Sequence, residues 1–224
     1  MEPYVITIDG PSGSGKGSLA LAVARALDFH ILDSGAIYRL AALKALNEQA
    51  DLENEAQVLG AIDGMQIHFE SGSELTIPFL DGVDVSASLR EEKTGAAASV
   101  VAAHPALRER LLQTQRDFFQ APGLVADGRD MGSTVFPEAR IKIFLLASAS
   151  VRAKRRYNQL INMGLSANIA DLRAEIEARD ERDSNRAASP LVPAHDAVVV
   201  DSSFMDRDQV FDLVMQHIAE VNAG

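Results

Sequence analysis

The chain has 224 residues, 47% of them hydrophobic, which is enough for one sizeable core or a core with a modest insertion. Its formal net charge of -11 argues against a protein that coats nucleic acid or an anionic membrane, and no apolar run is long enough to cross a bilayer. The chain has no cysteine, which excludes disulfides and thiolate metal sites, and its first residues lack the features of a secretory signal. We therefore expect a cytoplasmic protein with no membrane or nucleic-acid partner.

The basic residues are unevenly divided, because 16 of the 21 are arginines. The planar guanidinium binds phosphate through two parallel hydrogen bonds, so the imbalance fits small phosphorylated ligands held in a local pocket. Ordinary surface usage explains it equally well.

A glycine-rich stretch follows the first hydrophobic run, residues 4–8, and leads into a helical pattern over residues 18–27. It reads Gly10-Pro11-Ser12-Gly13-Ser14-Gly15-Lys16-Gly17-Ser18. Glycines let the backbone wrap around a polyphosphate, and the helix adds its positive N-terminal end. Lys16 would reach the β- and γ-phosphates of ATP, and the hydroxyl of Ser18 is suited to holding Mg²⁺. The stretch predicts an ATP-binding P-loop; a dinucleotide-binding fingerprint fits less well, because Ser18 stands where the third glycine should be.

The rest of the chain alternates strand and helix patterns. Buried strands are predicted at residues 29–32, 123–126, 140–146 and 197–200, and helices at residues 36–46, 51–62, 90–103, 106–119, 150–162, 167–183 and 206–221. This order predicts an α/β fold, a P-loop NTPase-like parallel sheet flanked by helices. Ligands gather beyond the carboxyl ends of such strands, so we expect the P-loop, residues 33–35 and residues 127–130 to converge there.

One segment departs from this pattern. Apolar and polar residues alternate over residues 65–79, with a turn at Ser71-Gly72-Ser73, and Val83 and Val85 are compatible with a third strand. We expect residues 63–86 to form a small antiparallel insertion, a second lobe beside a core made of residues 1–62 and 87–224.

Basic side chains recur at three further places. Ser34 and Arg39 lie on consecutive turns at a predicted helix start, a workable clamp for a second phosphate. Arg179, Asp183 and Arg186 share one helix face, which is compatible with either ligand binding or a solvated ladder of salt bridges. The segment Asp127-Gly128-Arg129-Asp130 packs two carboxylates and an arginine at a strand end, where the alternative is a capped loop.

Together these features resemble the bacterial type of cytidylate kinase, a family of nucleoside monophosphate kinases. The resemblance covers nearly the whole chain and is carried by residues 6–17, 32–39, 126–132, 142–145, 185–187 and 190–191. The additional Gly17 and the small inserted sheet are habitual in this family. Ser18 stands where the family usually has Thr, and because both side chains offer a hydroxyl we expect no change in the chemistry.

The resemblance implies a role for each candidate residue. ATP is bound by the P-loop with Lys16, and Mg²⁺ is held by Ser18. The acceptor phosphate is surrounded by Ser34, Arg39, Arg129 and Arg186; the base is read by Asp130, Ser99 and Arg108; and the sugar hydroxyls are met by Arg179 and Asp183. The catalytic residues are Lys16, Arg129, Arg186 and one arginine of a mobile lid at about residues 152–166, taken as Arg155 among Arg152, Arg155 and Arg156. A basic helix surface is the alternative to the lid.

Cytosine and uracil differ where the resemblance places Asp130. A carboxylate accepts from the N4 amine of cytosine, whereas the O4 of uracil would face it and leave buried polar groups unpaired. The implied lobe at residues 63–86 would bind CMP, and the site should reject UMP.

The implied reaction is transfer of the γ-phosphoryl group of ATP to CMP or dCMP. The acceptor phosphate is already an anion, so positioning and charge neutralisation suffice, and the scattered histidines indicate no further chemistry. One rival hypothesis is a P-loop kinase for uridylate or a metabolite hydroxyl, which Asp130 with Ser99 disfavours. A second is a nucleotide switch, which does not need so many arginines. A third is a nucleic-acid ATPase, which the acidic net charge disfavours. We expect a monomer.

Overall fold

The computed structural model describes residues 2–71, 76–162, 164, 166–186 and 188–223. They divide into two compact units: unit 1 comprises Met1–Leu32 and Arg116–Gly224, and unit 2 comprises Asp33–Gln115. Within the described ranges, none of the helices combines the length and the apolar character that crossing a bilayer requires.

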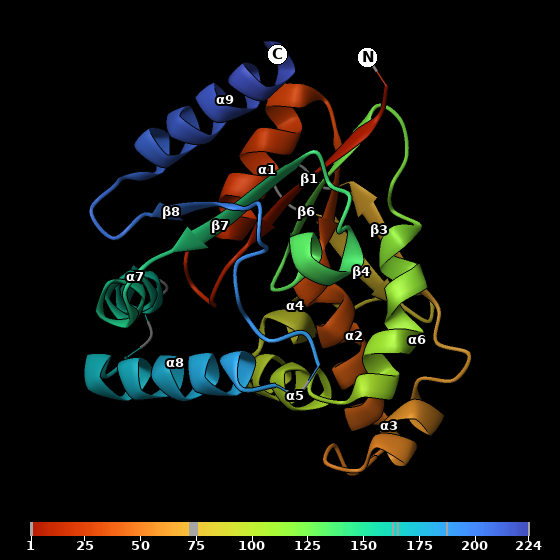
Figure 1. Ribbon diagram of the computed structural model, residues 1–224. Helices are drawn as coiled ribbons and strands as arrows, with labels where there is room; N and C mark the ends of the chain where they lie inside the picture. Colours follow the sequence, from red (N-terminus) through yellow and green to blue (C-terminus); the bar gives the residue numbers. More distant parts are fainter. Residues whose placement is uncertain (1, 72–75, 163, 165, 187, 224) are drawn as a thin grey trace. The chain divides into compact units, whose positions relative to one another are not determined.

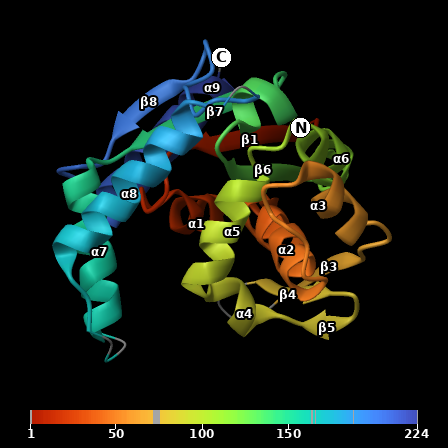
Figure 2. The same cartoon turned by 90° about the horizontal axis from the view of Figure 1, so that it is seen from below.

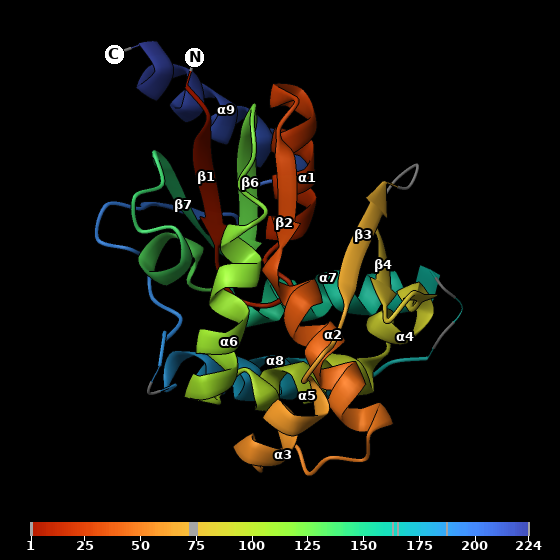
Figure 3. The same cartoon turned by 90° about the vertical axis from the view of Figure 1, so that its right-hand side faces the viewer.

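The main sheet has five strands among the described residues, in the order β2-β6-β1-β7-β8 (Figures 1 and 3). Their bounds are β1 Tyr4–Asp9, β2 His30–Asp33, β6 Gly123–Gly128, β7 Ile141–Leu146 and β8 Val198–Asp201. β1 pairs in parallel with β6 and β7, and β7 pairs in parallel with β8. Every residue of β1 and β6 is buried, as expected for central parallel strands covered on both faces.

In unit 1 the helices alternate with the strands of the sheet along the chain. They are α1 Lys16–Leu27, α7 Ala149–Asn162, α8 Ile169–Ser184 and α9 Arg207–Ala223, with a π-helical turn η1 at Met131–Val135. Figure 1 shows α1 beside α9, and apolar side chains of both helices share one core with β1 and β7, including Ile8, Val23, Ile143 and Val214. α7 and α8 pack against each other (Figure 2).

Unit 2 combines helices with a small antiparallel sheet, in the order β3-β4-β5 among the described residues. Its elements are α2 Ser34–Asn47, α3 Glu55–Ala61, β3 Ile67–Ser71, β4 Thr76–Leu80, β5 Val83–Asp84, α4 Ser86–Arg90, α5 Glu92–Val101 and α6 Pro105–Arg116. Leu40 of α2, Leu80 of β4 and Leu89 of α4 share a core, so the strands pack on helices of their own unit.

The predicted fold class, a parallel sheet flanked by helices with a small antiparallel sheet, is confirmed. The bounds of a lobe at residues 63–86 stay a prediction. Gly72 and Ser73 of its predicted turn lie outside the described residues. The helix predicted at residues 90–103 is present as α5 but begins only at Glu92, because Glu91 has an extended backbone (φ -64°, ψ 142°) that separates it from α4. The helix predicted at residues 51–62 begins only at Glu55, since the side chain of Asn54 caps it by accepting from the Gln57 N–H.

Candidate active site

The P-loop joins β1 to α1 in a conformation that requires its glycines. A Cβ on Gly10 would lie 2.2 Å from the carbonyl oxygen of Leu145, so no larger residue fits where the loop passes the end of β7. Gly13 and Gly15 have φ values of 76° and 98°, and α1 begins directly after Gly15. The hydroxyl of Ser14 is buried and has no hydrogen-bond partner in the described part of the chain. A polyphosphate at this helix N-terminus would supply an acceptor for it.

Lys16 faces a carboxylate from the neighbouring strand. Its Nζ lies 3.7 Å from Oδ1 of Asp127, and the two side chains are only 12% and 9% exposed. A Cβ on residue 17 would lie 3.0 Å from Oδ2 of Asp127, so the additional Gly17 makes room for this carboxylate beside the first turn of α1. Sequence reasoning gave Asp127 no role of its own. Its position at the end of a buried strand next to β1 could have identified it as a site residue.

A cavity of about 870 Å³ adjoins the P-loop within unit 1. Its walls come from the P-loop, α1, the end of β7, α7 and the segment that follows β8, including the start of α9: Gly13, Ser14, Gly15, Ser18, Leu19, Ala22, Leu145, Arg152, Arg155, Arg156, Gln159, Ser202, Met205, Asp206, Arg207, Asp208, Val210 and Phe211. The segment after β8 was missed from the sequence, although β8 ends at the same edge of the sheet as β1. The space can hold the nucleoside of a nucleotide whose phosphates lie in the P-loop.

Arg155 and Arg156 of α7 both line this cavity, and Arg155 binds backbone carbonyls there. Arg155 donates to the carbonyl oxygens of Ser14 (3.0 Å) and Ser202 (2.9 Å). It therefore links the P-loop to the segment after β8 and stands beside the expected phosphate position. Arg156 donates to Gln159 on the same helix. The lid at residues 152–166 stays a prediction, and residues 163 and 165 lie outside the described part.

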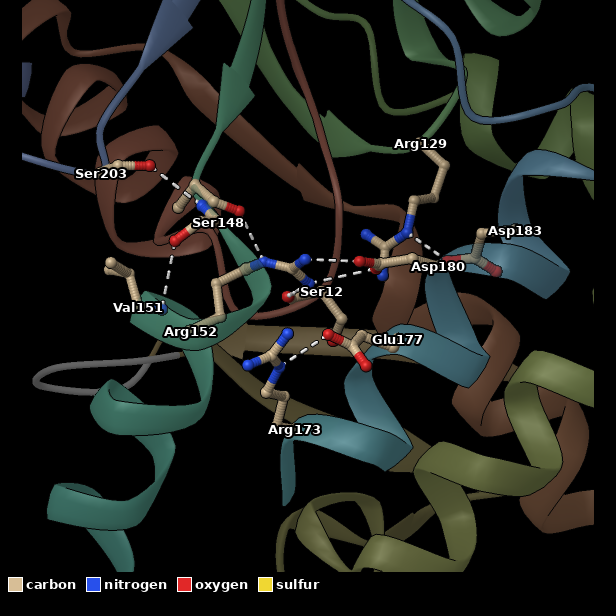
Figure 4. Close-up of polar contacts among 11 residues, drawn as sticks. Ser12, Arg129, Ser148, Val151, Arg152, Arg173, Glu177, Asp180, Asp183 and Ser203 are labelled. Carbon is tan, nitrogen blue, oxygen red and sulfur yellow. Dashed lines mark hydrogen bonds and ion pairs between the residues drawn. The ribbon is translucent and has the colours of Figure 1, made fainter. Parts of the chain in front are cut away.

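Three arginines predicted for the acceptor site gather around the buried carboxylate of a fourth predicted residue, Asp183. The Nε of Arg129 donates to Oδ2 of Asp183 at 2.8 Å, and the two side chains are 17% and 6% exposed (Figure 4). Arg186 donates from Nε to the Asp183 carbonyl at 3.3 Å. Burial tends to raise the pKa of Asp183, but the positive charges of Arg129, Arg186 and Arg179 together outweigh burial and lower it. The burial of Asp183 disfavours the alternative of a solvated ladder, while Arg179 and Arg186 on the same face are half-buried.

Asp9, at the end of β1, was also missed. Its carboxylate accepts from the backbone N–H groups of Met131 and Gly132, both at 2.8 Å, and thereby fixes the turn that follows the buried Asp130. Burial raises the pKa of Asp9 to about 7; the two backbone hydrogen bonds lower it, and the nearby charges of Asp130 and Asp127 raise it.

Unit 2 holds the other four predicted acceptor-site residues. Ser99 on α5 is buried, and its hydroxyl has no hydrogen-bond partner within the described ranges. Arg108 on α6 is buried; its guanidinium carbon lies 5.4 Å from the centre of the Tyr38 ring, and Nη1 donates to the Ala102 carbonyl at 3.2 Å.

Ser34 and Arg39 lie on α2. The Ser34 hydroxyl donates to Oε1 of Gln115 at 2.7 Å, so it must leave this partner before it can donate to a phosphate. Arg39 is half-buried.

Comparison with known proteins identifies the family. The cytidylate kinase family model matches residues 6–220. The chain is 52% identical to the cytidylate kinase of Aeromonas hydrophila over 98% of this chain and 95% of that protein, and 51% identical to that of Vibrio parahaemolyticus over 96% and 95%. It is 53% identical to the cytidylate kinase of Photobacterium profundum over 92% of this chain and 90% of that protein. The P-loop, the arginine cluster and these matches agree, and the chain belongs to the cytidylate kinase family.

Proposed function

We propose that the chain transfers the γ-phosphoryl group of ATP to CMP or dCMP, giving ADP and CDP or dCDP. The observation that carries this proposal is a P-loop beside a nucleoside-sized cavity, in the same unit as three half-buried arginines around the buried Asp183. A nucleotide switch needs only the first feature. Membership of the cytidylate kinase family supports the phosphotransferase over the other rivals, a nucleic-acid ATPase and a kinase for another acceptor.

ATP would lie with its phosphates in the P-loop, residues 10–18, and its nucleoside in the adjoining cavity. Lys16 neutralises the β- and γ-phosphates, and the buried Ser14 hydroxyl donates to one of their oxygens. Arg155 already stands beside Ser14, and its remaining N–H groups are suited to bind the transferring group.

The residues beside Lys16 also fit Mg²⁺. Ser18 offers a hydroxyl and Asp127 a buried carboxylate, the oxygen donors that this ion prefers. Within the described ranges no three His, Cys, Asp or Glu side chains are grouped as a metal cage, which suits an ion held mainly by substrate phosphates and water. When bound, Mg²⁺ would neutralise charge on the transferring phosphoryl group.

The acceptor phosphate would be bound by Ser34, Arg39, Arg129 and Arg186, and the sugar hydroxyls by Arg179 and Asp183. Asp183 suits this task, because the surrounding arginines keep it ionised and so able to accept hydrogen bonds from hydroxyls. The base would be read by Asp130, Ser99 and Arg108. The unpartnered Ser99 hydroxyl supports this assignment, because a buried hydroxyl without a partner is costly unless a ligand supplies one.

The chain's own contribution to the reaction is alignment and charge. The phosphate of CMP is an anion at neutral pH and attacks in line without a strong base. Lys16 and Arg155 on the donor side, with Arg129 and Arg186 on the acceptor side, would bring four positive charges to the oxygens of the two substrates.

The test is Mg²⁺-dependent formation of ADP with CMP, dCMP, UMP, AMP or no acceptor, with the diphosphate product identified. We expect fast transfer to CMP and dCMP only. Nucleotide binding without transfer would refute the proposal. Replacing Asp130 with alanine should reduce the preference for CMP over UMP, and an unchanged preference would remove Asp130 from base recognition.

We further propose that the enzyme works as a monomer in the cytoplasm. The absence of cysteine and the net charge of -11 support this location. Light scattering after size exclusion tests the monomer, since a mass of twice 24.1 kDa would contradict it.

A further inference from the structure

Arg152, the first arginine of α7, is part of the frame of the donor site. Its side chain is only 4% exposed. Nε donates to the carbonyl of Ala147 at 2.8 Å and Nη1 donates to the carbonyl of Ser12 in the P-loop at 2.9 Å. A Cβ on Gly13 would touch the Cβ of Arg152 at 3.5 Å, so the arginine also packs against the loop. One side chain therefore joins the end of β7 to the P-loop.

The remaining N–H groups of Arg152 meet the carboxylate of Asp180 on α8. Nη1 lies 3.1 Å from Oδ1, and Nη2 contacts Oδ2, so the pair is bidentate (Figure 4). The planar fork and the carboxylate fix each other's orientation, which a single point contact would not do. Asp180 consequently determines how Arg152 presents its other two N–H groups to the carbonyls of Ser12 and Ala147.

Asp180 and Asp183 are three residues apart on α8 and therefore share a helix face. Asp180 binds Arg152, which holds the P-loop, while Asp183 binds Arg129 at the end of β6. Figure 4 shows the two pairs side by side along α8. One helix thus carries both connections, one to the P-loop and one to a residue proposed for the acceptor phosphate.

We propose that Asp180 is a positioning residue for phosphoryl transfer: through Arg152 it sets the conformation of the P-loop, and through α8 it aligns the acceptor-binding residues with the donor. This inference rests on the proposed function. Asp180 does not contact the reacting atoms; it acts through Arg152 and through the helix that also holds Arg179 and Asp183.

The test compares Asp180→Asn with the wild type in steady-state transfer from ATP to CMP. Asparagine keeps the shape of the side chain but loses the charge and the bidentate pairing. We expect kcat to fall and the KM for ATP to rise, with kcat/KM lowered on the order of ten- to a hundredfold, as expected when a group that positions a substrate shifts slightly. Asp180→Glu keeps the charge and should recover a large part of the loss.

A matched control lies on the same helix. Glu177 also forms an ion pair, with Arg173 at 2.7 Å, but both side chains are about half exposed and neither bonds to the P-loop. Glu177→Gln should have the kinetic constants of the wild type. Arg152→Lys, which keeps the positive charge but lacks the fork, should show the same defect as Asp180→Asn and replaces it if that variant does not fold.

The stability of each variant is measured by thermal unfolding, and all kinetics are run well below the transition. A structural role alone would lower the unfolding temperature and leave kcat and KM of the folded enzyme unchanged; that result would overturn the inference. A wild type without transfer activity would instead refute the proposed function. As a further check, the effects of Asp180→Asn and Asp183→Asn on the KM for CMP should be non-additive, because both act through α8; strict additivity contradicts the alignment role.

Discussion

Asp9 and Asp183 are both buried carboxylates of unit 1, but their surroundings have opposite effects. Asp9 faces two backbone N–H groups and the charges of Asp130 and Asp127, and burial raises its pKa to about 7. Burial acts in the same direction at Asp183, yet three arginines outweigh it and lower the pKa. Depth in the fold does not decide the charge of a side chain; the partners present at that depth do.

Removing the carboxylate of Asp183 should have the largest effect on stability. The variant Asp183→Ala removes the carboxylate that Arg129 pairs with and that lies near Arg179 and Arg186, and breaking a buried pair in this way costs about 3–5 kcal/mol. Urea unfolding at pH 7 measures the loss. A loss below about 1 kcal/mol would show that water or rearrangement already neutralises the cluster.

Asp9 should make the protein less stable as the pH rises. The folded state holds a proton on Asp9 up to about pH 7, while the unfolded state releases it near pH 3.8. Stability from this group is therefore complete below pH 3.8 and decreases as the pH rises to 7, by at most about 4 kcal/mol at 1.36 kcal/mol per pH unit.

The measurement is the free energy of unfolding of wild type and Asp9→Asn between pH 4 and 8. The variant cannot titrate at this position, so the difference between the two proteins should change across the window. A constant difference would show that Asp9 is already ionised at low pH.

Asp183 should give the opposite, smaller dependence. Its pKa is lowered in the folded state, so its contribution is fully present above pH 3.8 and is lost as the pH falls below 3.8 through the folded pKa. Comparing acid unfolding of the wild type with that of Asp183→Asn isolates this contribution. Parallel acid transitions in the two proteins would contradict it.

Glu177→Gln should have the smallest effect. Glu177 and Arg173 form an i,i+4 pair on the same helix as Asp183, but their side chains are 50% and 56% exposed. Such pairs contribute about 0.3–0.5 kcal/mol and less at high salt. Thermal unfolding at low and high salt checks this; a loss comparable with that of Asp183→Ala would mean that burial does not separate the two pairs.

Local patterns in the sequence were sufficient for the P-loop, the succession of strands and helices along the chain and the small antiparallel sheet, because glycine geometry and hydrophobic periodicity are properties of neighbouring residues. The family resemblance, carried by long motifs, identified the kinase and is confirmed. The division between α4 and α5 was not visible, because Glu91 has no sequence feature of a helix break.

Contacts between distant residues could not be predicted. Arg152 and Arg155 reach carbonyls of Ser12 and Ser14 about 140 positions away, and nothing near either arginine indicates a backbone partner. The face of α8 with Arg179 and Asp183 was compatible with either ligand binding or a solvated salt-bridge ladder. Residue spacing shows which side chains share a helix face, but not whether that face is buried. Asp180 went unnoticed for that reason, since the sequence around it does not show that the fold places Arg152 opposite it, whereas Glu177 pairs only along its own helix with Arg173.

The cavity beside the P-loop has a consequence for how the protein is made. One wall consists of residues from Ser202 to Phe211, which the ribosome adds long after the P-loop. Until that segment has emerged and docked, a nascent chain has the phosphate loop without the wall that would enclose a nucleoside. A ligand of this cavity would therefore meet its complete set of contacts only once nearly all of the 224 residues have been translated.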